Sequence, residues 1–329
     1  MSNKIPKETL VGLYETMLRI RMFEEKVVEL YPAQEMKTPV HLYIGQEAIA
    51  AGVCLNLVKD DYLLSNHRGH GHCIAKGTDM GVMMAEFYGK AGGCSGGKGG
   101  SMHLVDPENS IPGNSAIVGG GIPMAVGAAL ASQIKGLKSV AVTFFGDGAV
   151  DEGVFHESMS FASLKKLPVV FVCENNLYAT NSHITARHPT GDIAGSAGAY
   201  GVPGVCVDGN DPEAVYECSK EAVERARKGT GPSLIEARTY RWKGHVGPDA
   251  DFEKGCRPEE ELREWMEKCP VKRFRERLLT SGVMSAEEMD GLRSAVAEEV
   301  DKAVSFSDKS PWPDTAELTR GLYYEGGGK

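Results

Sequence analysis

Two short hydrophobic segments, each followed at once by a polar turn, constrain the fold of this chain more than any other feature. Residues 140–145 are apolar and partly β-branched and run into Gly146-Asp147-Gly148, and residues 168–173 run into Glu174-Asn175-Asn176. Both have the length of buried strands, and the residues between them, 155–164, have a helical pattern. This order predicts a βαβ unit and therefore an α/β fold with a parallel sheet.

The rest of the chain predicts helices at both ends. Residues 6–31 have the apolar spacing of an amphipathic helix, residues 214–227 predict another helix, and residues 233–238 predict a third strand. Residues 240–257 are a long connection that suits an active-site loop. Ser285-Ala286-Glu287-Glu288 predicts the start of a last helix through a capping box. We expect one structural unit: an N-terminal helical arm (1–40), an α/β domain (41–270) and a C-terminal helical arm (271–329).

Composition excludes several classes of function. The net charge is −9, which argues against binding to nucleic acid or to an anionic membrane surface, because both require clustered cations. No stretch has the roughly 20 apolar residues of a membrane span, and the N-terminus lacks the apolar core of a signal peptide. Eight scattered cysteines, without a Cys-x-x-Cys pair, indicate reduced thiols that are mostly buried. We therefore expect a cytoplasmic protein.

The polar turns after the two strands predict a metal–phosphate site. The carboxyl ends of parallel strands meet at one edge of a sheet, so the two turns should face a single ligand. The glycines beside Asp147 let a diphosphate approach the backbone, and its carboxylate requires a cation between itself and the phosphates. Asn176 can supply an amide oxygen and Tyr178 a main-chain carbonyl, which predicts Mg²⁺ bound by Asp147, Asn176 and Tyr178. Each turn alone is more commonly structural; the prediction rests on their combination.

The pattern resembles a known family. Gly146-Asp147-Gly148-Ala149, a helix, and then the segment 167–176 match the thiamine diphosphate motif of the alpha subunits of 2-oxo acid dehydrogenase decarboxylase components. The resemblance runs from the N-terminal helix to the region of Pro270 and is weaker beyond it. It includes three further segments: 41–47, 67–71 and 98–103. It implies a thiamine diphosphate-binding fold and an oxidoreductase of the pyruvate or acetoin dehydrogenase type.

The resemblance also assigns residues. It implies that Arg68 binds the diphosphate, together with the turn Gly146, Asp147, Gly148 and Ala149, and that Ala116 and Val118 line the aminopyrimidine ring. The candidates for proton transfer are His41, His103 and His245, because imidazole exchanges protons near neutral pH. His245 lies in the segment where the family has a histidine on a mobile loop. His67 stands where many relatives have tyrosine, so its contact is left open.

The partners are likewise implied by the resemblance. The family forms α₂β₂ heterotetramers in which a beta subunit supplies the glutamate that activates the cofactor, and a lipoyl acyltransferase accepts the acyl group. Residues 119–131, rich in Gly and Ala, suit close packing in such an assembly. Residues 246–251 contain no serine, so the phosphorylation control of mammalian relatives is not implied. The identity of the 2-oxo acid or acyloin is open.

Four other functions compete with this interpretation. A dinucleotide oxidoreductase is disfavoured because Asp151 stands at the third glycine of its fingerprint. A nucleotide triphosphatase is also disfavoured. Residues 92–98 resemble a phosphate loop, but Gly99 stands where that motif has Ser or Thr, and the preceding residues 83–88 look helical, whereas a strand precedes a phosphate loop. A transketolase-like enzyme acting on a sugar acceptor, without a lipoyl partner, is the main alternative. A subunit that only presents cofactor to its partner is the fourth.

Overall fold

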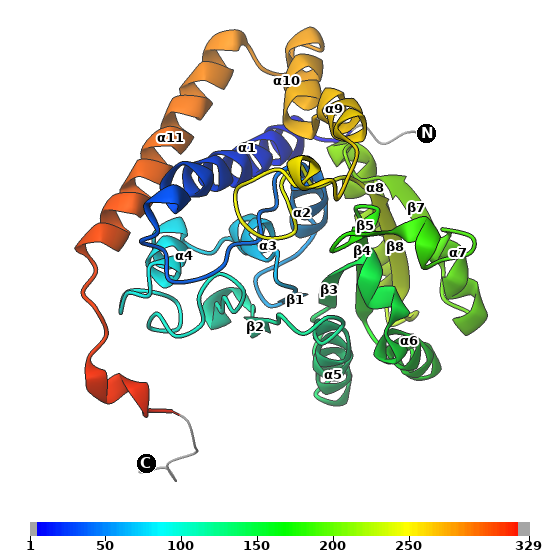
Figure 1. Ribbon diagram of the computed structural model, residues 1–329. Helices are drawn as coiled ribbons and strands as arrows, with labels where there is room; N and C mark the ends of the chain where they lie inside the picture. The colour runs from blue at the N-terminus through cyan, green and yellow to red at the C-terminus, as the bar shows by residue number, and fades with distance from the viewer. Residues whose placement is uncertain (1–4, 322–329) are drawn as a thin grey trace.

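The computed structural model describes residues 5–321, and its centre is a six-stranded parallel sheet with the strand order β2-β1-β3-β4-β8-β7 (Figure 1). The strands are β1 (Tyr62–Ser65), β2 (Gly113–Asn114), β3 (Ala141–Gly146), β4 (Val169–Asn175), β7 (Gly204–Asp208) and β8 (Ser233–Arg238). Two further strands, β5 (Tyr178–Ala179) and β6 (Ser182–His183), form a small antiparallel ribbon directly after β4. The sheet confirms the α/β fold class.

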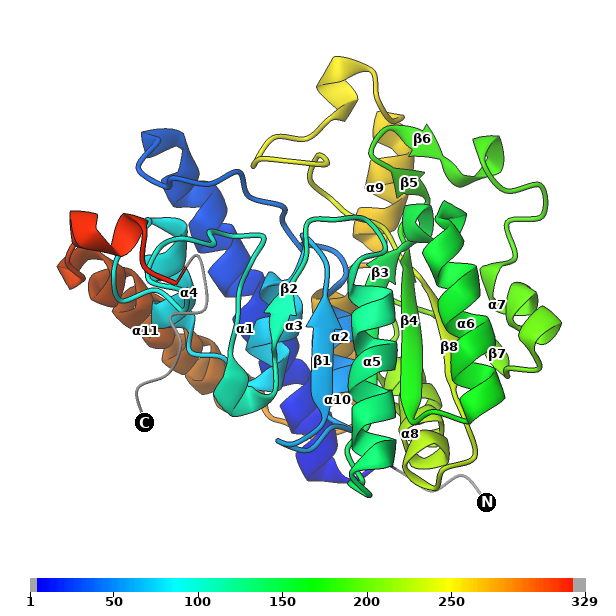
Figure 2. The same cartoon turned by 90° about the horizontal axis from the view of Figure 1, so that it is seen from below.

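Helices cover both faces of the sheet. They are α1 (Lys7–Leu30), α2 (Glu47–Cys54), α3 (His70–Lys76), α4 (Met80–Phe87), α5 (Gly121–Ile134), α6 (Gly153–Lys165), α7 (Ile193–Ser196), α8 (Pro212–Arg227), α9 (Glu259–Glu267), α10 (Pro270–Thr280) and α11 (Ala286–Lys309). Figure 2 shows α5 and α6 side by side in front of β3 and β4. The long helices α1 and α11 lie on the opposite side, with α11 packed on α4.

The central strands are buried on both faces, which explains why their sequences are almost continuously apolar. Val142 and Phe144 of β3 belong to the hydrophobic cluster that includes α1, α2 and α11. Ala141 and Phe145, which alternate with them along the strand, pack in a second cluster with α5 and α6. Because side chains alternate along a strand, a run of hydrophobic residues serves both layers at once.

The predicted βαβ unit is confirmed. α6 connects β3 to β4, the strands are parallel, and Gly146 is paired with Glu174. This register places the two polar turns next to each other. The N-terminal helix, the helix before β8 and β8 itself are also where the sequence predicts them. The capping box is present, because Ser285 accepts a hydrogen bond from the Glu288 amide and Glu288 accepts one from the Ser285 amide.

Three strands of the main sheet, β1, β2 and β7, escape the sequence prediction because they are short or lack apolar alternation, and so do the two-residue strands β5 and β6. The cysteines are free, as expected, but only four are buried: Cys54, Cys73, Cys173 and Cys269. Cys94, Cys218 and Cys256 are partly exposed, and Cys206 is exposed on the edge strand β7. Residues of both predicted arms pack in the same cluster as the sheet; residues 1–4 and 322–329 of those arms lie outside the described residues. Within the described residues, no helix is long and apolar enough to cross a membrane.

Candidate active site

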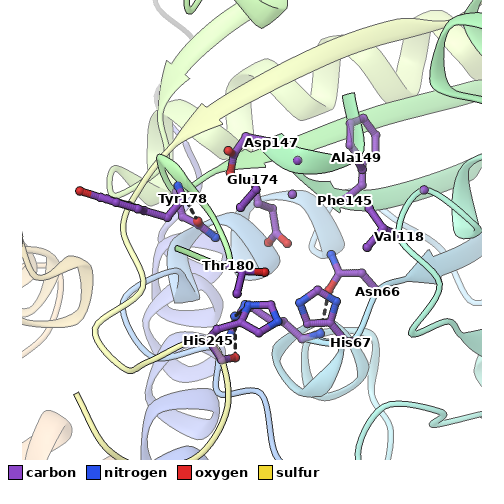
Figure 3. Close-up of a pocket in the computed structure, with 16 residues that line it drawn as sticks. Asn66, His67, Val118, Phe145, Asp147, Ala149, Glu174, Tyr178, Thr180 and His245 are labelled. Atoms are coloured by element: carbon purple, nitrogen blue, oxygen red, sulfur yellow. Dashed lines mark hydrogen bonds between the residues drawn. The ribbon is translucent and has the colours of Figure 1, made fainter. Parts of the chain in front are cut away.

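The candidate active site is a pocket at the carboxyl ends of β3 and β4 (Figure 3). Its walls come from five parts of the chain: the loop after β1, the segment before α5, the turn after β3, the segment from β4 to β5, and the loop after β8. It is lined by Asn66, His67, Arg68, Val118, Gly119, Phe145, Gly146, Asp147, Gly148, Ala149, Glu174, Asn176, Tyr178, Ala179, Thr180 and His245. Nine of the twelve site residues predicted from the sequence line this one pocket.

Asp147 and Asn176 stand side by side because their strands are in register. Asp147 is 1% exposed, and its Oδ2 is ion-paired with Arg187, which leaves Oδ1 as the oxygen available to a ligand. Burial raises the pKa of Asp147, and the nearby Arg187 opposes that change. The Asn176 amide nitrogen donates to Gln46 Oε1 at 3.0 Å, which fixes the amide and orients its oxygen. The arrangement offers one carboxylate and one neutral oxygen to a hard cation.

The glycines of the turn after β3 allow a close approach. A Cβ on Gly148 would lie 2.7 Å from the Cβ of Ala179, so any side chain there would displace β5. A Cβ on Gly146 would meet no atom within 4 Å. The turn is therefore packed on one side and open on the other, and its backbone can contact a ligand directly.

Arg68 is a buried cation without a carboxylate partner in the part of the chain that the structure describes. It is 4% exposed, and its guanidinium donates only to neutral acceptors: the Leu42 carbonyl at 3.1 Å, the His245 carbonyl at 2.8 Å and the His245 Nδ1 at 3.2 Å. Burial, and then the charge of Arg241, lowers the pKa of Arg68 to about 9. A buried charge is normally paired, so an unpaired guanidinium in a pocket wall fits an anionic ligand.

The predicted catalytic histidines are placed differently from one another. His245 lines the pocket, and His41 lies behind it with ring centroids 5.2 Å apart. His103 is exposed, does not line the pocket, and points its Nδ1 at the Gly99 carbonyl, 3.1 Å away. Val118 lines the pocket with about half of its side chain exposed, and Ala116, two residues earlier, does not line it.

Sequence reasoning missed Glu174 as a site residue. Its carboxylate lines the pocket and is held by two buried groups, the hydroxyl of Tyr43 and the Nε2 of His72 at 2.9 Å. The other ring nitrogen of His72 is 2.7 Å from Ser65 Oγ. The only sequence signal for Glu174 was its place beside Asn176 in the turn after a buried strand. The sequence marks His67 only because it stands where many relatives have tyrosine. In the structure, His67 also lines the pocket.

The glycine-rich loop 92–100 does not form a nucleotide site. Its anion is internal: the buried carboxylate of Glu86 accepts hydrogen bonds from the loop amides of Ser95, Gly97, Gly99 and Gly100, at 2.7–3.0 Å, and from the Ser95 hydroxyl at 2.8 Å. The element before the loop is the helix α4, as the pattern of residues 83–88 predicts. A loop whose amides are occupied by a carboxylate cannot cradle a phosphate with them.

Comparison with known proteins shows which family this chain resembles. The family model described as dehydrogenase E1 component matches residues 15–316. The chain is 46% identical over 326 residues to the alpha subunit of acetoin:2,6-dichlorophenolindophenol oxidoreductase from Bacillus subtilis, covering 98% of this chain and 97% of the relative. It is 40% identical to the subunit of the same name from Cupriavidus necator, covering 97% and 95%. It is 39% identical to the pyruvate dehydrogenase E1 component subunit alpha of Porphyra purpurea, covering 97% and 94%.

Proposed function

The chain belongs to the dehydrogenase E1 component family, and on this premise we propose that it is the alpha subunit of a thiamine diphosphate-dependent dehydrogenase that acts on acetoin or a 2-oxo acid. The observation that carries the proposal is the convergence of unpaired Arg68 with Asp147 and Asn176 in one pocket. The higher identity to the acetoin subunit from Bacillus subtilis, 46% against 39% for the pyruvate subunit, favours acetoin as the first substrate to test.

Mg²⁺ is the metal that this donor set would hold. The proposed ligands are the carboxylate of Asp147, the amide oxygen of Asn176 and the main-chain carbonyl of Tyr178. In the described residues no three His, Cys, Asp or Glu side chains form a metal-binding group. A metal held by one carboxylate needs oxygens from its ligand, and Mg²⁺ typically combines few protein ligands with phosphate oxygens.

The diphosphate would lie between this metal and Arg68, against the open backbone of Gly146 to Ala149. The planar guanidinium offers paired donors to phosphate oxygens. Ala116 and Val118 are the proposed contacts of the aminopyrimidine ring, and of the two Val118 lines the pocket. A diphosphate in this position would explain why buried Arg68 faces the pocket without a carboxylate partner among residues 5–321.

Thiamine diphosphate supplies, when bound, the carbanion and the electron sink of the reaction. The chain positions it and manages protons around it. His245, which lines the pocket, and His41, which lies behind it, are the proposed proton-transfer residues, whereas His103 would act only if its loop came closer to the pocket. Phe145 and Val118 contribute apolar surface to the pocket walls.

We further propose a beta subunit, in an α₂β₂ assembly, and a lipoyl acyltransferase that accepts the product. Support for the subunit partner comes from apolar side chains exposed on and near α5 and α6, of which Ile117, Ile134 and Leu164 are each 76% exposed. Exposed apolar surface of this kind is typical of protein interfaces. The names of the relatives support a dehydrogenase over the transketolase-like alternative.

The test is turnover by the chain co-expressed with its beta partner, supplied with thiamine diphosphate and Mg²⁺. We expect reduction of 2,6-dichlorophenolindophenol with acetoin or with one of a set of 2-oxo acids. Asp147→Asn should abolish Mg²⁺-dependent cofactor binding, and the exposed Asp60→Asn serves as a matched control. Tight cofactor binding without oxidation of any of these substrates would refute the dehydrogenase and favour transfer to a sugar acceptor.

A further inference from the structure

Three histidines from distant parts of the chain meet at one end of the pocket. The ring centroids of His41 and His67 are 4.8 Å apart, those of His41 and His245 5.2 Å, and those of His67 and His245 5.3 Å. Figure 3 shows His67 and His245 beside each other, at the end opposite Asp147. We call these three side chains the histidine cluster. Imidazoles this close repel one another when charged, so protonation of one member lowers the pKa of its neighbours in the cluster.

The cluster faces a positive charge. Arg68 lies against it, with Nη2 3.2 Å from the Nδ1 of His245. Arg241, whose charge also lowers the pKa of all three imidazoles, is paired with Asp251 at 3.1 Å. Burial, followed by the charge of Arg68, lowers the pKa of His41 to about 3, of His67 to about 2 and of His245 to about 4. All three imidazoles are therefore neutral at pH 7.

The negative groups around the pocket are occupied elsewhere. Glu174 is bound by Tyr43 and His72, and Asp147 at the far end is ion-paired with Arg187. They do not contact the cluster. No carboxylate of the pocket therefore neutralises Arg68 beside the imidazoles. An anionic ligand bound to Arg68 would do so. Removing that repulsion raises the pKa of each imidazole.

His67 is the member of the cluster best placed to hold a proton next to a ligand. The Nδ1 of His245 accepts from Arg68, so protonation there would break that hydrogen bond. His41 does not line the pocket. His67 lines it, and its ring nitrogens have no hydrogen-bond partner within residues 5–321. Only one proton is expected, because two charged imidazoles about 5 Å apart repel each other.

We propose that His67 is a proton-accepting residue of this site, and that an anionic ligand bound against Arg68 enters together with one proton taken from solvent by the histidine cluster. The inference rests on the proposed function, which makes the diphosphate of the cofactor the anion. It goes further by assigning a role to His67 and by coupling cofactor binding to protonation. Since the pKa rises on binding, the affinity for the cofactor should increase as the pH falls toward the pKa of the bound state.

The experiment is calorimetric titration of thiamine diphosphate, with excess Mg²⁺, into the chain co-purified with its beta partner. Titrations in two buffers of different ionisation enthalpy, Pipes and Tris, give the number of protons taken up. The variants are His67→Asn and His67→Tyr; the second keeps an aromatic ring against His41 but cannot take up a proton near neutral pH. His156→Asn, at an exposed position outside the pocket, is the matched control.

We expect wild type and His156→Asn to take up more protons than either His67 variant, and we expect this difference to grow as the pH falls, because the pKa of free His67 lies far below 7. The ligand's own protonation cancels in this difference. Equal uptake in wild type and both His67 variants, with tight binding in all of them, would overturn the inference and leave the proposed function intact. Absence of Mg²⁺-dependent binding in the wild type would overturn both.

Discussion

Replacing Glu86 by glutamine should loosen the glycine-rich loop 92–100. In the wild type, Oε1 of Glu86 accepts from the Ser95 hydroxyl and from the amides of Gly99 and Gly100, while Oε2 accepts from the amides of Ser95 and Gly97. Glutamine has nearly the same shape but only one oxygen. The glutamine side chain fits better with its oxygen at the Oε1 position, where three donors point. Its NH₂ group then faces the two backbone N–H groups that Oε2 accepts from in the wild type.

Those two amides would then face a donor instead of an acceptor. A buried donor left without an acceptor costs about 1–3 kcal/mol, and relaxation of the loop favours the lower part of that range, so we expect about 2–4 kcal/mol in total. The free energy of loop opening falls by this amount, which corresponds to about 30- to 700-fold faster amide exchange in the loop. The assay is hydrogen–deuterium exchange followed by mass spectrometry of peptides that cover residues 92–103.

The effect also has a defined pH dependence. Burial acts to raise the pKa of Glu86, but the hydrogen bonds from Ser95, Gly100 and Gly97 outweigh it and hold the pKa below its ordinary value. The stabilisation is therefore complete above the ordinary pKa of a glutamate and disappears as the pH falls through the lower, folded-state value. Exposed Glu108→Gln is the control and should change loop exchange less than about twofold. Unchanged exchange of the loop in Glu86→Gln would refute the reasoning.

Three further predictions follow from other contacts. Asp61→Asn should destabilise the fold by about 3–5 kcal/mol in urea unfolding, since buried Asp61 pairs with Arg227 at 2.7 Å and caps the Val140 amide; exposed Asp60→Asn should be neutral. Gly148→Ala should weaken cofactor binding, measured by calorimetry, at least about tenfold because its Cβ would collide with Ala179, whereas Gly153→Ala, where a Cβ meets no atom within 4 Å, should bind normally. Ser285→Ala should cost about 1 kcal/mol through loss of the α11 cap, with Ser285→Thr retaining most of it; equal melting temperatures for both would contradict this.

The sequence predicts the parts of the site that depend on local pattern. Strands β3 and β4 are long enough to show an apolar run, and the register of parallel neighbours then brings Asp147 and Asn176 together. The contacts of His67 and Glu174 depend on chain segments far away, His245 and His72 among them, and no local signal reports such distances.

Other features are ambiguous in sequence for a physical reason. A glycine-rich loop built to hold an anion has the same composition whether the anion is a bound phosphate or an internal carboxylate, so the role of Glu86 becomes visible only in the structure. Likewise, the sequence shows that Arg68 is a cation, but only the fold shows that it is buried with carbonyls instead of carboxylates around it.

The residues that line the pocket are spread along the chain, and this determines when during synthesis the protein can first bind a ligand. The sheet requires Tyr62 to pair beside Ala141 and Val170 beside Ser233, so its strands close long loops and should assemble slowly. His245, which completes the pocket, follows the last of these strands. A ribosome must therefore have made the chain as far as His245 before a binding-competent site can exist. A ligand cannot guide the early steps of folding; it can only protect the finished domain, by binding the native state and not the unfolded one.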